Sequence, residues 1–512
     1  MSFVVTFELD EAGVVRLAEL IALKIRLGDA IALSGDLGAG KTTLARAMLS
    51  ALLEDPSAEV PSPTFSLRQE YATRRLTVAH FDFYRLGSPD EALELGLDEV
   101  LETGAVIVEW PERAPGLLPD NRFEITLAET ADAGVRRVSL RGHGTAAARA
   151  RRISQIMTFF ARLPSWQGAR IAYLQGDAST RSYARLSGSQ GTALLMDAPR
   201  QPDGPPVRDG LPYSRIAHLA EDVRPFSAIG RALRGAGLSA PEILAEDLDA
   251  GLMLIEDLGE RVYSAEVARD AGLQEELWLG AVDVLVKLRT VPAPRQLPLL
   301  DGSDCPIPSY DRGAMRIEVE LLRDWYWPAL HGERVPPEVR AEFLALWGEV
   351  FDHLQQEPPA CVLRDFHSPN LLWLPDRDGL ARVGIIDFQD AQRGSTGYDL
   401  ASLLQDARVD VPEALEVRLL EHYLREAAVL DPTFDADAFK FAYAALGAQR
   451  NTKILGIFVR LSRRDGKAQY LAHLPRIWRY VERNLRNPRL AELAAWYDRY
   501  FPADTRTGAL PA

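Results

Sequence analysis

The chain has 512 residues, of which 47% are hydrophobic and 26% are charged, and its formal net charge is −15. This length exceeds what one hydrophobic core supports, so we expect at least two domains, and the composition excludes a chain that is disordered throughout. Because both halves of the chain share the negative charge, neither half is expected to bind nucleic acid by itself, and no direct contact with DNA is expected.

The cysteine content and the apolar segments indicate the compartment. The only cysteines are Cys305 and Cys361, and they form no CxxC pair, so two free thiols are expected. The first residues lack a basic segment followed by an apolar stretch, and no apolar run approaches the length of a membrane span. We therefore expect a cytoplasmic protein without membrane contact.

The first 142 residues predict alternating strands and helices. A strand over 3–9 precedes a helix with apolar residues at helical spacing, and a strand over 30–33 leads into a glycine-rich turn. Later strands are expected over 76–83, 105–109, 123–127 and 135–140. The Gly/Ala/Arg run at 143–151 is the expected linker, and Ile153, Ile156, Met157, Phe160 and Leu163 predict an amphipathic helix after it.

The glycine-rich turn fits the phosphate-binding pattern GxxxxGK[ST] between an apolar strand and a helix. The residues expected to surround the phosphates are Gly35, Asp36, Gly38, Ala39, Gly40, Lys41, Thr42 and Thr43. Backbone N–H groups and the helix N-terminus attract phosphate oxygens, while Lys41 reaches the outer phosphates and Thr42 holds Mg²⁺. ATP or GTP is the expected ligand.

Two carboxylates are candidates for the acid beside the metal. Asp82 ends the strand 76–83, and Glu109 ends the strand 105–109. Strand ends at the same edge of a parallel sheet are where such an acid lies in P-loop proteins. Each carboxylate could equally be a solvated turn residue.

Four segments in order resemble the TsaE family, the small ATPases of bacterial tRNA threonylcarbamoyladenosine synthesis: GDLGAGKTT at 35–43, Ser62 to Phe65, HFDFYR at 80–85 and VEW at 108–110. The resemblance covers residues 1–142. It implies that Glu109 is the catalytic, metal-linked acid, that Asp82 is a second acid near Mg²⁺, and that residues 62–65 form a switch-like loop. It also implies ATP hydrolysis coupled to TsaD- and TsaB-like partners, which alone would bring the module to tRNA adenosine 37. A P-loop kinase acting on a metabolite is the alternative.

A second site is predicted near residue 365. Asp365 is followed by Asn370 and later by Asp387, which directly follows the apolar strand 383–386, and this is the spacing of a protein-kinase-like centre. Asp365 would accept the proton of the attacking hydroxyl, and Asn370 and Asp387 would hold Mg²⁺ on the ATP phosphates. A plain Asp/Asn turn is the alternative.

The segments RDFHSPN and IIDF resemble the aminoglycoside-phosphotransferase and choline-kinase superfamily. Within it, GDASTRSY at 176–183, MDAP at 196–199 and LIEDLG at 254–259 resemble the N-acetylmuramate/N-acetylglucosamine anomeric kinases of peptidoglycan recycling. The resemblance implies a two-lobed kinase fold over residues 152–505 and an amino sugar as acceptor. It also implies that Ser179, Thr180 and Arg181 cover the ATP phosphates and that Glu256 and Leu258 lie at the hinge that holds adenine.

Two positions depart from kinase patterns. Met196 stands where kinases place a lysine against the ATP phosphates, so Arg181 or another cation would have to replace it, and Leu363 stands where histidine is common. A kinase of another small hydroxyl metabolite, and a nucleotide-sensing regulatory protein with a silent kinase fold, therefore remain as alternatives. Trp325, Tyr326 and Trp327 either stack on a sugar or pack in the core.

Together these patterns predict an α/β chain, with an N-terminal P-loop NTPase domain and a C-terminal two-lobed, aminoglycoside-phosphotransferase-like domain. Both domains are predicted to be ATP- and Mg²⁺-dependent enzymes.

Overall fold

The computed structural model describes residues 2–55, 57–174, 181–355, 358–507 and 510. These residues form two compact units: Met1–Pro199 with Leu244–Asp257, and Arg200–Ile243 with Leu258–Ala512. The first unit therefore contains the whole predicted P-loop module together with strands that were expected to open the kinase-like module. The predicted α/β class is confirmed.

A seven-stranded sheet forms the centre of the P-loop module, in the order β1-β7-β6-β2-β5-β4-β3. Its strands are β1 (Ser2–Leu9), β2 (Ala30–Ser34), β3 (Arg68–Ala72), β4 (Thr77–Asp82), β5 (Gly104–Glu109), β6 (Arg122–Glu129) and β7 (Arg136–His143). Strands β4, β5, β2 and β6 run parallel, whereas β1, β7 and β3 pair antiparallel with their neighbours. The edge strand β3 was not predicted, because its sequence RQEYA is mostly polar and only partly buried.

Helices cover both faces of this sheet, which explains why its central strands are apolar along their whole length. Along β5, Ala105 and Ile107 pack in one core with the helices α1 (Glu11–Lys24), α2 (Lys41–Leu53) and α5 (Ala146–Ala161). Val106 and Val108 point the other way, into a core shared with α3 (Pro89–Glu94) and α4 (Leu97–Thr103). The sheet therefore holds its carboxyl edge rigidly, and this edge carries the candidate site.

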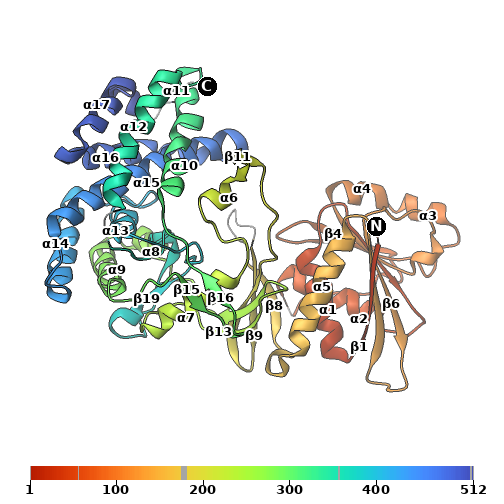
Figure 1. Cartoon of the computed structure of the whole chain (residues 1–512). Helices are drawn as coiled ribbons and strands as arrows, with labels where there is room; N and C mark the ends of the chain where they lie inside the picture. Colours follow the sequence, from red (N-terminus) through yellow and green to blue (C-terminus); the bar gives the residue numbers. More distant parts are fainter. Residues whose placement is uncertain (1, 56, 175–180, 356–357, 508–509, 511–512) are drawn as a thin grey trace. The chain divides into compact units, whose positions relative to one another are not determined.

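Most of the expected linker 143–151 lies in a helix. The structure ends β7 at His143 and begins α5 at Ala146 (Figure 1 labels this helix). Ala146, Arg149 and Ala150 are buried. Alanine and arginine are strong helix formers, so a run that looked like a linker by its Gly and Ala content continues into the helix predicted after it. That helix does bury the predicted apolar stripe.

A second sheet in the first unit has the order β13-β14-β10-β9-β8. Its strands are β8 (Arg170–Leu174), β9 (Ser182–Gly188), β10 (Gly191–Asp197), β13 (Ile243–Asp247) and β14 (Leu252–Glu256). Leu186, Leu195 and Leu254 from this sheet lie in the same hydrophobic core as α1 and α5. The P-loop module and this sheet are thus joined by one continuous apolar core.

Charged side chains reinforce the same junction. Asp197, at the end of β10, is buried and pairs with Lys24 of α1 and, at 2.7 Å, with Arg152 of α5. Burial alone would raise the pKa of Asp197, but Lys24 and Arg152 outweigh it and lower that pKa below its ordinary value. Arg75 of the P-loop module lies 4.6 Å from the ring centre of Tyr173 in β8.

We expect Asp197→Asn to lower the free energy of unfolding by about 2 kcal/mol or more, because removing one partner of a buried ion pair leaves the others uncompensated. Urea denaturation would measure the change. The control is Glu8→Gln, since the Glu8–Arg137 pair is exposed and its loss should cost less than about 1 kcal/mol. Equal, small effects of the two substitutions would contradict the junction.

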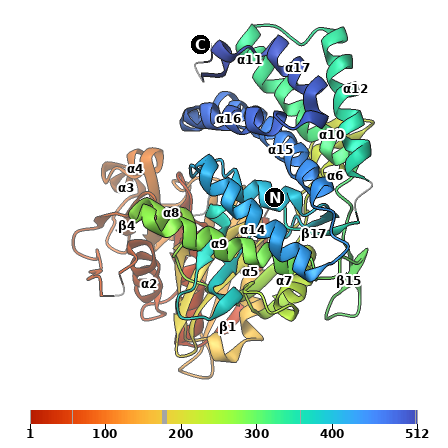
Figure 2. The same cartoon turned by 90° about the vertical axis from the view of Figure 1, so that its left-hand side faces the viewer.

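The second unit is mostly helical. Its helices are α6 (Tyr213–Ile216), α7 (Arg224–Gly235), α8 (Tyr263–Arg269), α9 (Gln274–Leu288), α10 (Arg312–Leu321), α11 (Trp327–His331), α12 (Pro337–Leu354), α13 (Gly397–Leu404), α14 (Glu413–Leu430), α15 (Ala436–Asp465), α16 (Leu474–Leu485) and α17 (Ala491–Tyr500). Two-stranded pairs join β11 (Pro206–Arg208) to β12 (Leu211–Pro212), β15 (Gln296–Pro298) to β16 (Asp304–Pro306), β17 (Ala360–Val362) to β20 (Gln392–Gly394) and β18 (Leu371–Trp373) to β19 (Val383–Ile385). Figure 2 shows α15 beside α16, and these helices pack tightly.

Two expectations concern side chains of this unit. Tyr326 and Trp327 are buried in its core and Trp325 packs against that core, so these aromatic residues belong to the core and not to a sugar platform. Cys305 and Cys361 are free thiols, as predicted. Within the described part of the chain, no helix combines the length and the apolar character needed to cross a membrane.

Candidate functional sites

The loop between β2 and α2 has the backbone of a phosphate cradle. Gly35, Gly38 and Gly40 have φ values of 139°, 81° and 104°, which residues with a side chain rarely adopt. A Cβ atom at Gly35 would lie 2.3 Å from the carbonyl oxygen of Leu127, so only glycine fits there. The loop leads directly into the N-terminus of α2 at Lys41, where N–H groups and the helix dipole favour an anion.

Lys41 lies at the mouth of this cradle. Its Nζ donates to the carbonyl oxygens of Gly35 and Asp36, at 2.7 and 2.9 Å, and lies 3.7 Å from the ring centre of Trp110. Burial lowers the pKa of Lys41, and the charges of Glu109, Glu112, Asp82 and Asp36 oppose that shift. The ammonium group is thus held by contacts that a phosphate oxygen would replace.

The structure brings the two predicted carboxylates to neighbouring strand ends. Asp82 of β4 and Glu109 of β5 are register partners in the parallel pair, and both are buried. The hydroxyl of Thr42 donates to Glu109 Oε2 at 2.9 Å, so Glu109 lies directly beside the residue expected to hold the metal. Asp82 accepts from Thr64 Oγ1 at 2.9 Å and from the N–H of Tyr84 at 3.0 Å.

These contacts fit a magnesium ion. Mg²⁺ prefers oxygen ligands and is usually held by one or two carboxylates together with substrate phosphates. Thr42, Glu109 and Asp82 supply a hydroxyl and two carboxylates at the edge of the phosphate cradle. The contact between Thr64 and Asp82 also ties the segment 62–65 to this edge, while Phe65 at its end is exposed.

His80 is a positioning residue to which the sequence analysis gave no role. Its Nε2 lies 3.0 Å from Glu109 Oε1, and its ring is completely buried. The imidazole therefore orients the carboxylate that Thr42 contacts from the other side. In the sequence, this role is indicated only by the place of His80 two residues before Asp82, which puts both side chains on the same face of β4.

In the second unit, the loop after β17 carries Asp365 and Asn370. Asp387 follows β19 and lies next to Asn370. Asn370 Nδ2 donates to the backbone oxygen of Asp365 at 3.0 Å and to Asp387 Oδ2 at 3.5 Å. Gln389 Nε2 donates to the other Asp387 oxygen at 2.8 Å. Since the Asn370 amide nitrogen is used in this way, its carboxamide oxygen is left for a cation next to Asp387, and this arrangement fits Mg²⁺.

Asp399, at the start of α13, anchors this loop. It accepts from the N–H groups of Leu363 and Arg364, at 2.6 and 2.8 Å, while Arg364 itself has a φ of 69°. Burial raises the pKa of Asp399 to about 7, although both N–H groups act in the opposite direction. Arg364, the residue before Asp365, is thus held in a strained backbone conformation by a carboxyl 35 residues away.

This shift predicts how stability depends on pH. Because the pKa of Asp399 is higher in the folded chain than its ordinary value near 3.9, its contribution to stability is complete below about pH 4 and is lost as the pH rises through about 7. We expect the difference in free energy of unfolding between wild type and Asp399→Asn to fall between about pH 4 and 8. Urea denaturation across that range would measure it, and a difference independent of pH would contradict the assignment.

The Arg364 side chain is neutralised by a buried cluster. It pairs with Glu318 of α10, which also accepts from Lys453 Nζ at 2.8 Å and from the Tyr310 hydroxyl at 2.6 Å. Burial would raise the pKa of Glu318, but Lys453 and Arg364 lower it to about 2. The cluster ties α10 and α15 to the catalytic loop through ionised groups.

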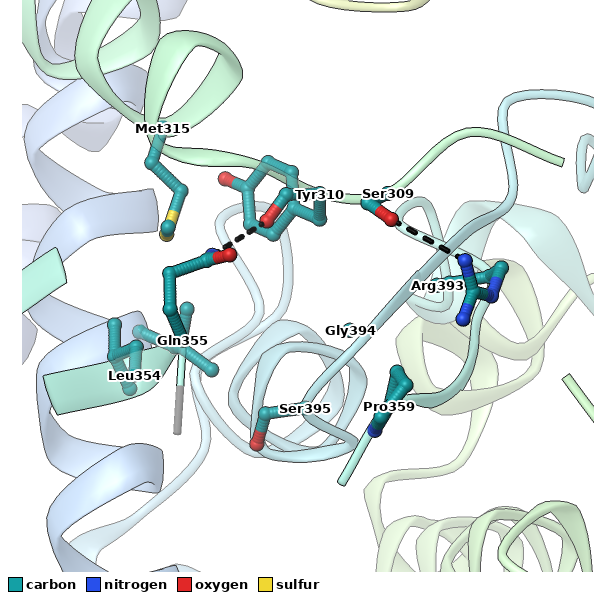
Figure 3. Close-up of a pocket in the computed structure, with 10 residues that line it drawn as sticks. Ser309, Tyr310, Met315, Leu354, Gln355, Pro359, Arg393, Gly394 and Ser395 are labelled. Carbon is teal, nitrogen blue, oxygen red and sulfur yellow. Dashed lines mark hydrogen bonds between the residues drawn. The ribbon is translucent and has the colours of Figure 1, made fainter. Parts of the chain in front are cut away.

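A cavity of about 120 Å³ lies beside Tyr310 (Figure 3). Gln355 Nε2 donates to the Tyr310 backbone oxygen at 3.2 Å, and Arg393 Nη1 donates to Ser309 Oγ at 3.4 Å. This volume is below the usual range of ligand sites, so we assign the cavity to imperfect packing and not to a substrate.

His367 lies within the catalytic loop and is buried. Its Nδ1 contacts the backbone oxygen of Asp365 at 2.9 Å, and its Nε2 lies 3.1 Å from Nη1 of Arg408. A guanidinium can only donate, so Nε2 accepts and Nδ1 carries the proton. Burial lowers the pKa of His367, in agreement with this neutral tautomer.

Of the residues expected to bind the nucleotide, Arg181 and Glu256 belong to the first unit and Leu258 to the second. The turn residues Ser179 and Thr180 fall outside the described residues, and Arg181 directly precedes β9. Glu256 ends β14, and Leu258 is buried. Met196 is fully buried on β10 and accepts from the Tyr183 hydroxyl, on the strand face opposite to Leu195 and Asp197.

Comparisons with known proteins match two successive parts of the chain. Residues 9–138 match the family described as threonylcarbamoyl adenosine biosynthesis protein TsaE, and residues 170–437 match the phosphotransferase enzyme family. An N-acetylmuramate/N-acetylglucosamine kinase of Caulobacter vibrioides is 40% identical over 343 residues, which are 65% of this chain and 92% of that protein.

Two TsaE proteins match the N-terminal part. The tRNA threonylcarbamoyladenosine biosynthesis protein TsaE of Rickettsia felis is 39% identical over 112 residues, which are 22% of this chain and 65% of that protein. The protein of the same description from Rickettsia bellii is 38% identical over 110 residues, which are 22% of this chain and 76% of that protein.

Proposed function

Because the chain belongs to the phosphotransferase enzyme family and, through its N-terminal module, to the TsaE family, we propose that it carries two ATP-dependent activities. The C-terminal module phosphorylates the anomeric hydroxyl of N-acetylmuramate and N-acetylglucosamine. The N-terminal module hydrolyses ATP for the threonylcarbamoylation of tRNA adenosine 37. The proposed modules span residues 1–142 and 152–505, joined through α5.

The contact of Asn370 with both Asp365 and Asp387 is the observation that carries the kinase proposal. Asp365 accepts the proton of the sugar hydroxyl as the hydroxyl oxygen attacks the terminal phosphorus of ATP. The bond from that phosphorus to the bridging oxygen breaks, and ADP leaves. Asn370 and Asp387 hold Mg²⁺, which when bound neutralises charge on the phosphates. Glu256 and Leu258 hold adenine, and Ser179, Thr180 and Arg181 cover the phosphates.

For the N-terminal module, the Thr42–Glu109–His80 chain of contacts carries the proposal. The cradle Gly35–Thr43 binds the ATP phosphates and Lys41 reaches the outermost one. Glu109 and Asp82, with Thr42, hold Mg²⁺, and Glu109 also accepts a proton from the attacking water. Since the chain is acidic, proteins of the TsaD and TsaB type bring this module to tRNA.

The kinase proposal is tested by incubating the purified chain with ATP and each sugar, and by locating the new phosphate with ³¹P NMR. We expect phosphate on the anomeric oxygen of both sugars. If ATP binds and neither sugar is phosphorylated, the acceptor is wrong, and the buried Met196 would then favour a silent kinase fold.

The ATPase proposal is tested by measuring phosphate release with and without TsaD and TsaB proteins. We expect their addition to increase the rate, and this increase should disappear in Lys41→Ala. A rate that the partners leave unchanged would contradict the proposed coupling.

A further inference from the structure

Arg450, on α15, is a buried cation to which the described residues offer no hydrogen-bond acceptor and no ion pair. Its side chain is 5% exposed, and its Nη1 is buried without a hydrogen-bond acceptor. In the part of the chain that the structure describes, Arg450 makes no hydrogen bond and no ion pair. Burial of a guanidinium is costly unless an acceptor compensates its charge.

The neighbouring cations differ from Arg450 in this respect. Lys453, one turn further along α15, and Arg364 of the catalytic loop both pair with Glu318. The chain therefore neutralises the buried cations that serve its architecture. Among the described residues, Arg450 has no such acceptor, which is typical of a residue that binds an anion from outside the chain.

Arg450 lies near the catalytic loop. Helix α15, which carries Arg450, packs against α13, and Asp399 of α13 accepts from the N–H groups of Leu363 and Arg364. The charge of Arg450 also acts on Asp399 and on His367, which contacts the backbone of Asp365. The exposed Arg408 also donates to His367, so two cations surround this part of the loop. The metal-binding Asn370 and Asp387 lie instead with β18 and β19, at the other end of the loop.

We propose that Arg450 binds the carboxylate of N-acetylmuramate, the group that N-acetylglucosamine lacks. A planar guanidinium matches a carboxylate in charge and geometry. The inference rests on the proposed sugar kinase activity, and it makes Arg450 a specificity residue for the acidic sugar. The other possible source of an anion is the terminal phosphate of ATP, and the experiment separates the two.

The test compares kinetics of the full chain on both sugars for wild type, Arg450→Gln and Arg450→Lys, with Arg464→Gln as control. Arg464 lies in the last turn of the same helix and is exposed. We expect Arg450→Gln to raise KM for N-acetylmuramate about 10- to 100-fold, the loss of a charge-assisted hydrogen bond, and to change KM for N-acetylglucosamine less than about two-fold. Arg450→Lys should lie between, and Arg464→Gln should match wild type.

Two results would overturn the inference. Equal losses on both sugars together with a raised KM for ATP would assign Arg450 to the phosphate, and unchanged kinetics on both would exclude any contact with substrate. If Arg450→Gln does not fold, Arg450→Lys, which retains the charge, provides the test. Its KM should still rise more for N-acetylmuramate than for N-acetylglucosamine. A wild-type chain that phosphorylates neither sugar would overturn the proposed function itself. This outcome is measured on the wild type alone, so it is distinguished from a failure of the Arg450 assignment.

Discussion

Phosphate transfer to either sugar is expected to be about 10²- to 10⁴-fold slower in Asp365→Asn than in wild type, because general-base catalysis contributes an effect of that size. The amide retains the shape of the side chain but cannot take the proton of the acceptor hydroxyl. The backbone contacts of Asp365 with Asn370 and His367 do not involve the carboxylate, so the loop should keep its structure. Initial rates with each sugar would measure the effect.

The matched control is Asp376→Asn, an exposed aspartate in the loop between β18 and β19. Its rate should equal that of wild type. ATP binding, followed by calorimetry, should survive in Asp365→Asn. Retention of more than about a tenth of the wild-type rate would show that Asp365 is not the base.

ATP hydrolysis by the N-terminal module is expected to fall about 100-fold or more in Glu109→Gln. Glu109 accepts from Thr42 and contacts His80, so the substitution removes the charge that faces the metal position and changes little of the packing. Phosphate release in the presence of the TsaD and TsaB partners would measure the effect.

Glu102→Gln is the control for that variant, since Glu102 is exposed on α4 of the same module. It should hydrolyse ATP at the wild-type rate. If Glu109→Gln and Glu102→Gln behave alike, the acid is not Glu109, and Asp82 becomes the remaining candidate at this edge of the sheet.

The phosphate cradle and the catalytic loop could be predicted because their chemistry lies in short contiguous patterns. Gly35 to Thr42 determine a backbone path between one strand and one helix, and Asp365 and Asn370 lie on one loop. In the structure the first pattern forms the loop between β2 and α2, and Asn370 of the second contacts Asp365 and Asp387. The P-loop strands were predicted for the same reason, since buried parallel strands are apolar along their length.

Residues whose partners are distant in sequence could not be predicted. Asp399 contacts the loop before Asp365 only because the chain folds back onto it. His80 contacts Glu109 on the neighbouring strand. Arg450 is one of many arginines in the sequence, and its burial without an acceptor among the described residues becomes visible only in the structure. The helix over most of the expected linker was not predicted, because the Gly and Ala content of this run was weighed above the helix propensity of Ala and Arg.

The sequence also did not predict the hydrophobic core that the P-loop module shares with the second sheet of the first unit. Motifs identify each module separately, but they say nothing of Leu195 and Leu254 packing with α1 and α5. This core joins the P-loop module to the second sheet. The two sets of catalytic residues proposed for the two reactions belong to different units. Each set should therefore serve its own reaction.

The most direct test of this account measures both reactions in the same variants: phosphate release stimulated by the TsaD and TsaB partners, and anomeric phosphate on N-acetylmuramate by ³¹P NMR. The account predicts that Lys41→Ala loses only the first reaction and that Asp365→Asn loses only the second. Loss of sugar phosphate in Lys41→Ala, or its persistence in Asp365→Asn, would contradict two separate ATP-using sites in this chain.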